Sequence, residues 1–114
     1  MKTINGETDS KIERSSGNVF ADLGFKDAEE RQTKVHLAVA INEVIRRRRL
    51  SQQQAAGYLG VNQPKVSTLS KYKLEGFSVD RLIRFLTLLD LDVEIVIRRK
   101  PRSRRSGRVT VTAA

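Results

Sequence analysis

The stretch before residue 48 carries its hydrophobic residues on one helical face. Their spacing of three and four residues predicts an amphipathic helix. Asp27 is expected to cap its start, with Glu29 and Glu30 near the positive end of the helix dipole, and the helix is expected to end near Arg48. The inward residues of this predicted helix are Leu37, Ala38, Ile41 and Ile45.

Two shorter helices are predicted on either side of a glycine. One apolar stripe lies within residues 55–59 and a second within residues 66–69. Gly60 stands between them, where a glycine accepts the left-handed backbone of a helix end without steric cost. Because Ala55 and Ala56 are small, the two helices are expected to cross closely over this turn.

Polar residues mark where both short helices begin. Ser51 and Gln54 have the spacing of a capping box, in which each side chain bonds the other residue's backbone N–H. Asn62 is expected to cap the second helix, with Pro64 in the first turn, where a missing N–H costs nothing. These signals agree on a helix-turn-helix between residues 52 and 71.

A further helix is predicted after Gly76. Ser78 is its expected cap, and Phe77 is expected to pack onto Leu82. Its inward stripe consists of Leu82, Phe85, Leu86 and Leu89.

Beyond Asp90 the hydrophobic period changes from helical to alternating, which predicts a β-strand over residues 92–98. A lone strand cannot satisfy its own backbone groups, so it needs a partner. The tail segment 109–112, a second copy of the chain or another protein can supply one. We favour a second copy, because a dimer would have the two-fold symmetry that helix-turn-helix repressors match to their operators.

These elements define the expected fold class and domain organisation. The chain is expected to be mainly α, a small helical bundle with a helix-turn-helix and one C-terminal β-strand paired in a dimer. With 114 residues, it has room for one domain. We assign residues 1–18 to a flexible arm, 19–97 to the domain and 98–114 to a basic flexible tail. The apolar cluster around Phe20 either completes the core or anchors a partner.

The helix after Asn62 is expected to turn a wholly polar face outward. Glutamine bonds adenine edges, lysine reaches guanine or phosphate, and small hydroxyls fit bases or backbone. An ordinary helical hairpin with a solvated polar face is the alternative. We predict that DNA bases are read by Gln63, Lys65, Ser67 and Thr68, and that phosphates are bound by Gln52, Lys71, Arg48 and Arg49. For the two arginines, offsetting the dipole of the preceding helix is an equal alternative.

The net charge of +9 favours a polyanionic partner. The charge is unevenly distributed: residues 1–30 hold four basic and seven acidic residues, residues 31–90 hold eleven and four, and residues 91–114 hold seven and two. The basic tail would add salt-dependent affinity for phosphates without reading sequence, or would serve only solubility.

Several function classes find no support in the sequence. There is no cysteine and a single histidine, His36, so no metal site is expected. No catalytic constellation or glycine-rich phosphate loop is present, so we expect neither an enzyme nor a cofactor. Without a long apolar run or a secretion signal, no membrane segment is expected and the protein is predicted to be cytoplasmic.

The segment LSQQQAAGYLGVNQPKVSTLSK resembles the Cro/repressor, or XRE, class of helix-turn-helix proteins. FADLGF and GFSVDRLIRFLTLLDLDVEIVI resemble the HigA-like antitoxin branch of that class, so the resemblance covers roughly residues 19–98. It implies a lambda-repressor-like fold, binding to double-stranded operator DNA, repression of the protein's own operon and neutralisation of a small basic toxin. A stand-alone XRE-type repressor and a basic RNA-associated protein are the alternative hypotheses.

Overall fold

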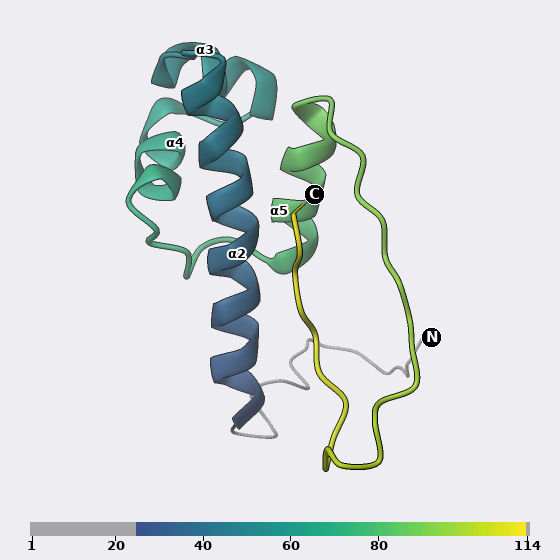
Figure 1. The fold of residues 1–114 in the computed structure, drawn as a ribbon. Helices are drawn as coiled ribbons and strands as arrows, with labels where there is room; N and C mark the ends of the chain where they lie inside the picture. The colour runs from purple at the N-terminus through teal and green to yellow at the C-terminus, as the bar shows by residue number, and fades with distance from the viewer. Residues whose placement is uncertain (1–24, 114) are drawn as a thin grey trace. The chain divides into compact units, whose positions relative to one another are not determined.

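Four α-helices follow one another in the computed structural model, which describes residues 25–113 (Figure 1). The expected arm over residues 1–18 and the apolar cluster around Phe20 lie outside the described residues. The helices are α2 (Phe25–Arg47), α3 (Gln52–Leu59), α4 (Gln63–Ser70) and α5 (Val79–Leu88).

The chain divides into two units after Gln32, within α2. In the first unit the helix starts at Phe25, so the expectation that Asp27 caps it is wrong. Asp27 lies in the first turn, where its carboxylate accepts a hydrogen bond of 2.7 Å from Arg31. A carboxylate in the first turn of a helix interacts favourably with the helix dipole, so Asp27 still suits this end of α2.

The core of the second unit is built from the predicted stripes. Leu37, Ala38 and Ile41 of α2 are buried, as expected. From the shorter helices and their connections the core takes Leu59, Leu69, Leu74, Phe77, Leu82, Phe85, Leu86 and Leu89. The rings of Phe77 and Phe85 meet edge to face, with centroids 6.0 Å apart. Phe77 and its predicted partner Leu82 are both buried in this core cluster.

The turn between α3 and α4 has the predicted local structure. Ser51 and Gln54 form both bonds of the capping box, at 3.0 Å and 2.8 Å. Gly60 has φ 70° and ψ 32°, the left-handed conformation. Asn62 accepts the N–H of Lys65 at 2.9 Å and so caps α4. These contacts fix where each helix begins and ends.

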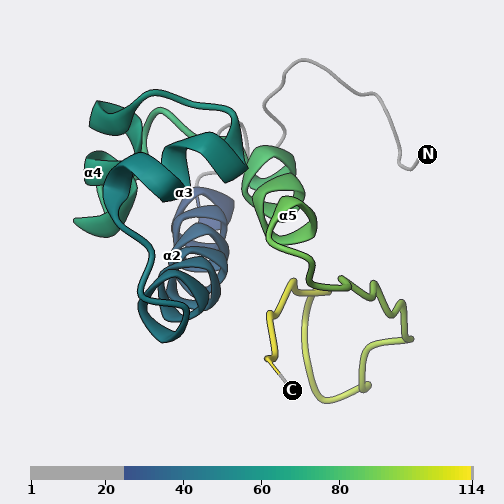
Figure 2. The same cartoon turned by 90° about the horizontal axis from the view of Figure 1, so that it is seen from above.

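A small hydrophobic cluster joins α3 to α4. Ala55, Ala56 and Val66 are buried in it, and Val61 of the turn packs against it. Figure 2, seen from above, places α3 next to α4, in agreement with the contacts between the two helices. The two alanines thus lie buried in the contact between α3 and α4, as expected.

The predicted β-strand over residues 92–98 is absent from the described part of the chain, which contains no strand. The segment leaves α5 without regular structure, turns near Pro101 and runs back in the opposite direction (Figure 1). The returning residues 109–112 form no ladder with it, although Val111 packs against the core. Alternation sets which side chains share a face, but a strand also requires a hydrogen-bonded neighbour, and residues 92–98 have none within the described chain.

The two glycines of the helix-turn-helix offer a matched test of the turn. A Cβ added at Gly57 or at Gly60 meets nothing within 4 Å, and only Gly60 has a positive φ. We expect Gly60→Ala to lower the free energy of unfolding by about 1–2 kcal/mol, because alanine is strained in the left-handed region. We expect Gly57→Ala, within α3, to raise it by about 0.5–1 kcal/mol. Urea unfolding of both variants measures this, and changes of the same sign would contradict the role of Gly60.

Candidate DNA interface

One face of α4 is open to solvent and carries no carboxylate. Gln63, Pro64, Ser70 and Lys71 are exposed, whereas Val66 and Leu69 on the opposite face are buried. Between Leu50 and Leu74 the sequence has three lysines and no acidic residue. A polyanion can therefore approach α3 and α4 without meeting a like charge on them.

The start of α4 is the best-defined part of this face. Asn62 caps the helix, so Gln63 is its first residue and the exposed Pro64 lies in its first turn. Backbone N–H groups at a helix start carry partial positive charge. In helix-turn-helix proteins the N-terminal residues of the second helix contact base edges, which is where Gln63 lies.

The far end of α4 is held by α2. The amide Nδ2 of Asn42 donates a partly buried hydrogen bond of 3.2 Å to the carbonyl oxygen of Leu69. Asn42 belongs to the residues that sequence reasoning missed. One signal in the sequence could have found it. Asn42 directly follows Ile41 of the apolar stripe, which is buried, so its side-chain amide is expected near another helix.

Lys65 does not project from the helix as a base-reading residue would. Its ammonium nitrogen lies 4.9 Å from the centre of the Phe77 ring, a cation–π contact, and the residue is half-buried. A Cβ at Gly76 would lie 3.7 Å from the Lys65 nitrogen, an ordinary van der Waals contact, so Lys65 also lies beside Gly76. Lys65 therefore has to leave Phe77 before it can reach DNA.

Two hydroxyl groups of α4 are already donors within the helix. Thr68 Oγ1 donates to the carbonyl of Pro64 at 2.8 Å, and Ser70 Oγ donates to that of Ser67 at 2.7 Å. A hydroxyl that donates in this way keeps acceptor lone pairs. Thr68 can thus accept from the amino group of adenine or cytosine while its own hydrogen stays on the helix.

The four arginines before α3 differ in their surroundings. Arg46 and Arg47 both bond the carboxylate of Glu43, at 2.7 Å and 3.0 Å, and the hydrogen bond from Arg46 lowers the pKa of Glu43. Arg48 donates to the carbonyl oxygen of Leu89 at 2.6 Å and so holds the end of α5. Arg49, with φ 54°, is exposed and has no ion pair in the described chain.

The remaining expected phosphate contacts lie at two helix ends. Gln52 is the first residue of α3, Lys71 follows the last residue of α4, and both are exposed. The turn Gly60–Asn62 connects the two helices. Gln52, Gln63 and Lys71 are thus carried by the two helices of one helix-turn-helix.

Residues 25–113 contain no group of three side chains suited to hold a metal ion. No helix among them is both long and apolar enough to cross a membrane.

Comparison with known proteins identifies this arrangement. Residues 19–98 match the family model described as a helix-turn-helix domain. A solved structure named "Putative XRE Family Transcriptional Regulator" is 67% identical to the chain and superimposes with a TM-score of 0.74; the match covers 77% of this chain and 99% of that one. The chain belongs to the XRE-type helix-turn-helix family. The XRE-type fold is that of a DNA-binding regulator, not of an enzyme. No curated protein matches the chain.

The Asn42 contact can be tested through stability. Asn42→Ala removes one hydrogen bond to the end of α4, so we expect the free energy of unfolding to fall by about 0.5–1.5 kcal/mol. Gln53→Ala, at an exposed position of α3, is the control and should change it by less than about 0.5 kcal/mol. Chemical denaturation of the two variants gives the comparison. A loss no greater than that of the control would mean that Asn42 does not hold α4.

Proposed function

We propose that this XRE-type protein is a sequence-specific transcriptional regulator that places α4 in the major groove of operator DNA. The observation that carries the proposal is the two-sided character of α4, which buries Val66 and Leu69 and leaves a polar, carboxylate-free face in solvent. The family and the name of the solved relative support the same function.

Within this proposal the side chains have different roles. Gln63 has the position and the donor–acceptor pair needed to bond adenine bidentately. Ser67 and Thr68 approach neighbouring base edges, and Lys65 joins them after it leaves Phe77. Gln52, Lys71 and Arg49 bind phosphates and fix the register of the helix on the duplex. Arg48 already donates one N–H to the Leu89 carbonyl, so only its remaining N–H groups contribute to phosphate binding.

The regulator is proposed to act as a homodimer. Two copies related by a two-fold axis would match operator half-sites whose centres are about 34–36 Å apart, one helical turn of DNA. The dimer contact is proposed to involve residues 92–98, in which Ile95 and Ile97 are strongly exposed.

The resemblance to HigA-like antitoxins extends the proposal to a toxin–antitoxin operon. On this view the operator lies in the protein's own promoter, and the partner is a small basic toxin. Adjacent genes offer a direct check, because a neighbouring reading frame for a small basic ribonuclease-like protein would support the antitoxin. Its absence would favour a stand-alone repressor with the same DNA interface.

The roles of Gln63 and Lys71 predict different losses of DNA affinity. Gln63→Ala should weaken operator binding by about 1–3 kcal/mol and leave binding to unrelated DNA almost unchanged. Lys71→Ala should weaken both kinds of binding and reduce the slope of log affinity against log salt by about 0.9. Fluorescence anisotropy over a salt series measures both quantities.

Ser70→Ala is a suitable control for these titrations, because the Ser70 hydroxyl already donates within α4 and is assigned no DNA contact. Equal, sequence-independent losses from Gln63→Ala and Lys71→Ala would refute the division into base and phosphate contacts.

A further inference from the structure

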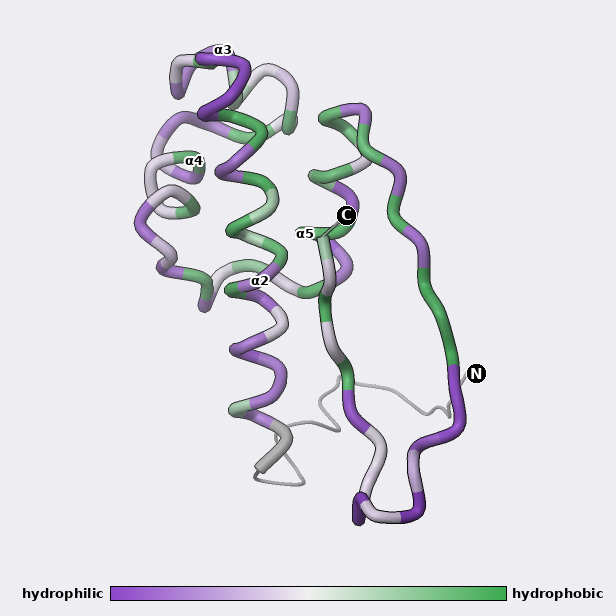
Figure 3. Tube along the Cα trace, viewed as in Figure 1, coloured by the Kyte–Doolittle hydropathy of each residue, from purple (hydrophilic) through white to green (hydrophobic). Residues whose placement is uncertain are grey.

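The segment from Asp92 to Lys100 is exposed although much of it is hydrophobic. Ile95 keeps 75% of its surface in solvent and Ile97 keeps 91%. Figure 3 shows a hydrophobic stretch here, followed by a hydrophilic run. Within the described chain, the backbone groups of this segment form no hydrogen bond with one another or with other residues. Such a segment has both the apolar surface and the free backbone groups that strand pairing consumes.

The charges of this segment are ordered in a way that suits one particular partner. On the even-numbered positions Asp92 and Glu94 precede Val96, and Arg98 and Lys100 follow it. The order is acidic, acidic, apolar, basic, basic. Read in reverse, it becomes basic, basic, apolar, acidic, acidic. A strand with this order is complementary to a second copy of itself in the antiparallel direction.

We infer that residues 92–100 of two copies pair as antiparallel strands about a two-fold axis at Val96. This register places Glu94 opposite Arg98 of the second copy and Asp92 opposite Lys100 of the second copy. Ile95 then faces Ile97 of the second copy on the other side of the ribbon. Opposite charges and apolar pairs directly across strands are stabilising. The inference rests on the proposed dimeric function and specifies its contact.

Within residues 92–100, the neighbouring antiparallel registers satisfy fewer charges. An axis at Ile95 pairs Asp92 with Arg98 but leaves Glu94 opposite Val96. Its only other charge pair joins Lys100 to Asp90, and Asp90 has φ 66°, outside the strand region. Parallel pairing in register would set like charges against each other along the whole segment, which is destabilising.

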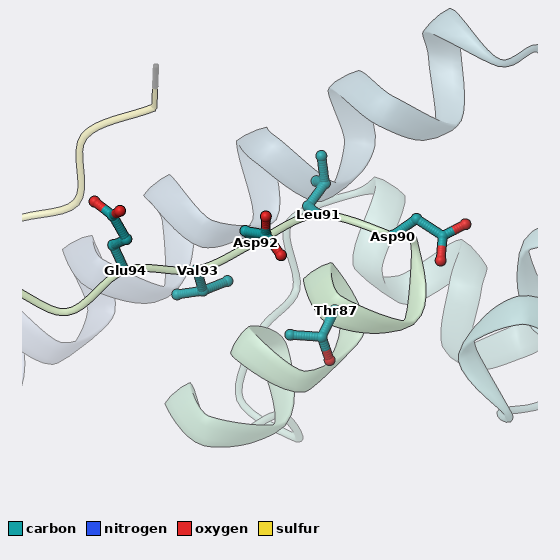
Figure 4. Close-up of a pocket in the computed structure, with 6 residues that line it drawn as sticks. All are labelled: Thr87, Asp90, Leu91, Asp92, Val93 and Glu94. Atoms are coloured by element: carbon teal, nitrogen blue, oxygen red, sulfur yellow. The ribbon is translucent and has the colours of Figure 1, made fainter.

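The hollow at the start of the segment fits the same partner. Its lining residues are Thr87, Asp90, Leu91, Asp92, Val93 and Glu94 (Figure 4). Three of the lining residues, Asp90, Asp92 and Glu94, carry carboxylates, and the basic end of the second strand would reach this part of the segment. In Figure 4, Val93 and Glu94 project from opposite sides of the chain, as neighbouring residues of a strand do.

The absence of cysteine from the sequence permits a clean test of the register. In the proposed ribbon only position 96 faces itself. The Val96→Cys variant should form a disulfide-linked dimer under mild oxidation. Ile95→Cys and Ile97→Cys should each link poorly alone and efficiently when the two are mixed, because directly opposite residues meet disulfide geometry and diagonal ones do not. Preferential self-linking through Ile95→Cys, or no linking at all, would overturn the register.

A charge exchange tests the same contact without a covalent bond. Glu94→Arg should reduce the dimer fraction at a fixed protein concentration at least several-fold, since it places arginine opposite Arg98. The double variant Glu94→Arg/Arg98→Glu should restore the dimer. Glu75→Arg, the same change at an exposed position outside the segment, is the control. Light scattering reports the dimer fraction, and a double variant that stays monomeric would overturn the pairing.

Failure of this inference can be told apart from failure of the proposed function. DNA carrying a single operator half-site should bind Glu94→Arg as well as it binds the native chain. If Val96→Cys cross-links but the native chain shows no operator preference, the strand pairing is supported and the regulatory function is rejected. Operator binding by a native chain that stays monomeric would reject the ribbon alone.

Discussion

The close packing of α3 on α4 is the constraint on which the candidate interface depends. The two helices share a small cluster of Ala55, Ala56 and Val66, and the left-handed Gly60 lets the chain reverse between them. Because the inward face of α4 is consumed by this contact and by Leu69, only its polar face can meet another molecule. The position of the surface proposed to face DNA is therefore a consequence of core packing, and it is determined by the buried residues of α3 and α4.

The long helix α2 and the turn that follows it orient the shorter helices through their C-terminal ends. Asn42 bonds the Leu69 carbonyl at the end of α4, and Arg48 bonds the Leu89 carbonyl just beyond α5. The last carbonyl groups of a helix lack intrahelical partners, so side chains from a neighbour can fix them. In this way Arg48, which charge alone would assign to DNA, has a structural contact. The positive charge of the 46–49 run is further reduced by Glu43, which leaves Arg49 as the one of the four with no ion pair or side-chain hydrogen bond in the described chain.

The sequence was sufficient for features that depend on neighbouring residues. The capping box at Ser51, the turn at Gly60 and the caps at Asn62 and Ser78 all link residues within a few positions of each other. Contacts between distant residues were not accessible in this way. Asn42 and Leu69 are 27 residues apart and Arg48 and Leu89 are 41 apart, so their pairing depends on how the helices pack. The same holds for Lys65. Its residue type and its place in α4 suit base reading, but its side chain packs on Phe77. Alternation at residues 92–98 predicted a strand, yet a strand needs a neighbour that the described chain does not provide.

The point where that segment leaves the core matters for regulation. The Leu91 N–H bonds the Leu86 carbonyl, and the Leu91 side chain packs against the main core. The segment therefore starts from a position fixed to α5 and not from a loose linker. A ribbon between two copies that begins at such points would hold their α4 helices in a defined relation, whereas pairing through a flexible tail would only raise local concentration. Operator half-sites have a set separation along the duplex. A ribbon attached rigidly to both domains would therefore favour operators with one half-site spacing, even if the strand contact itself is weak.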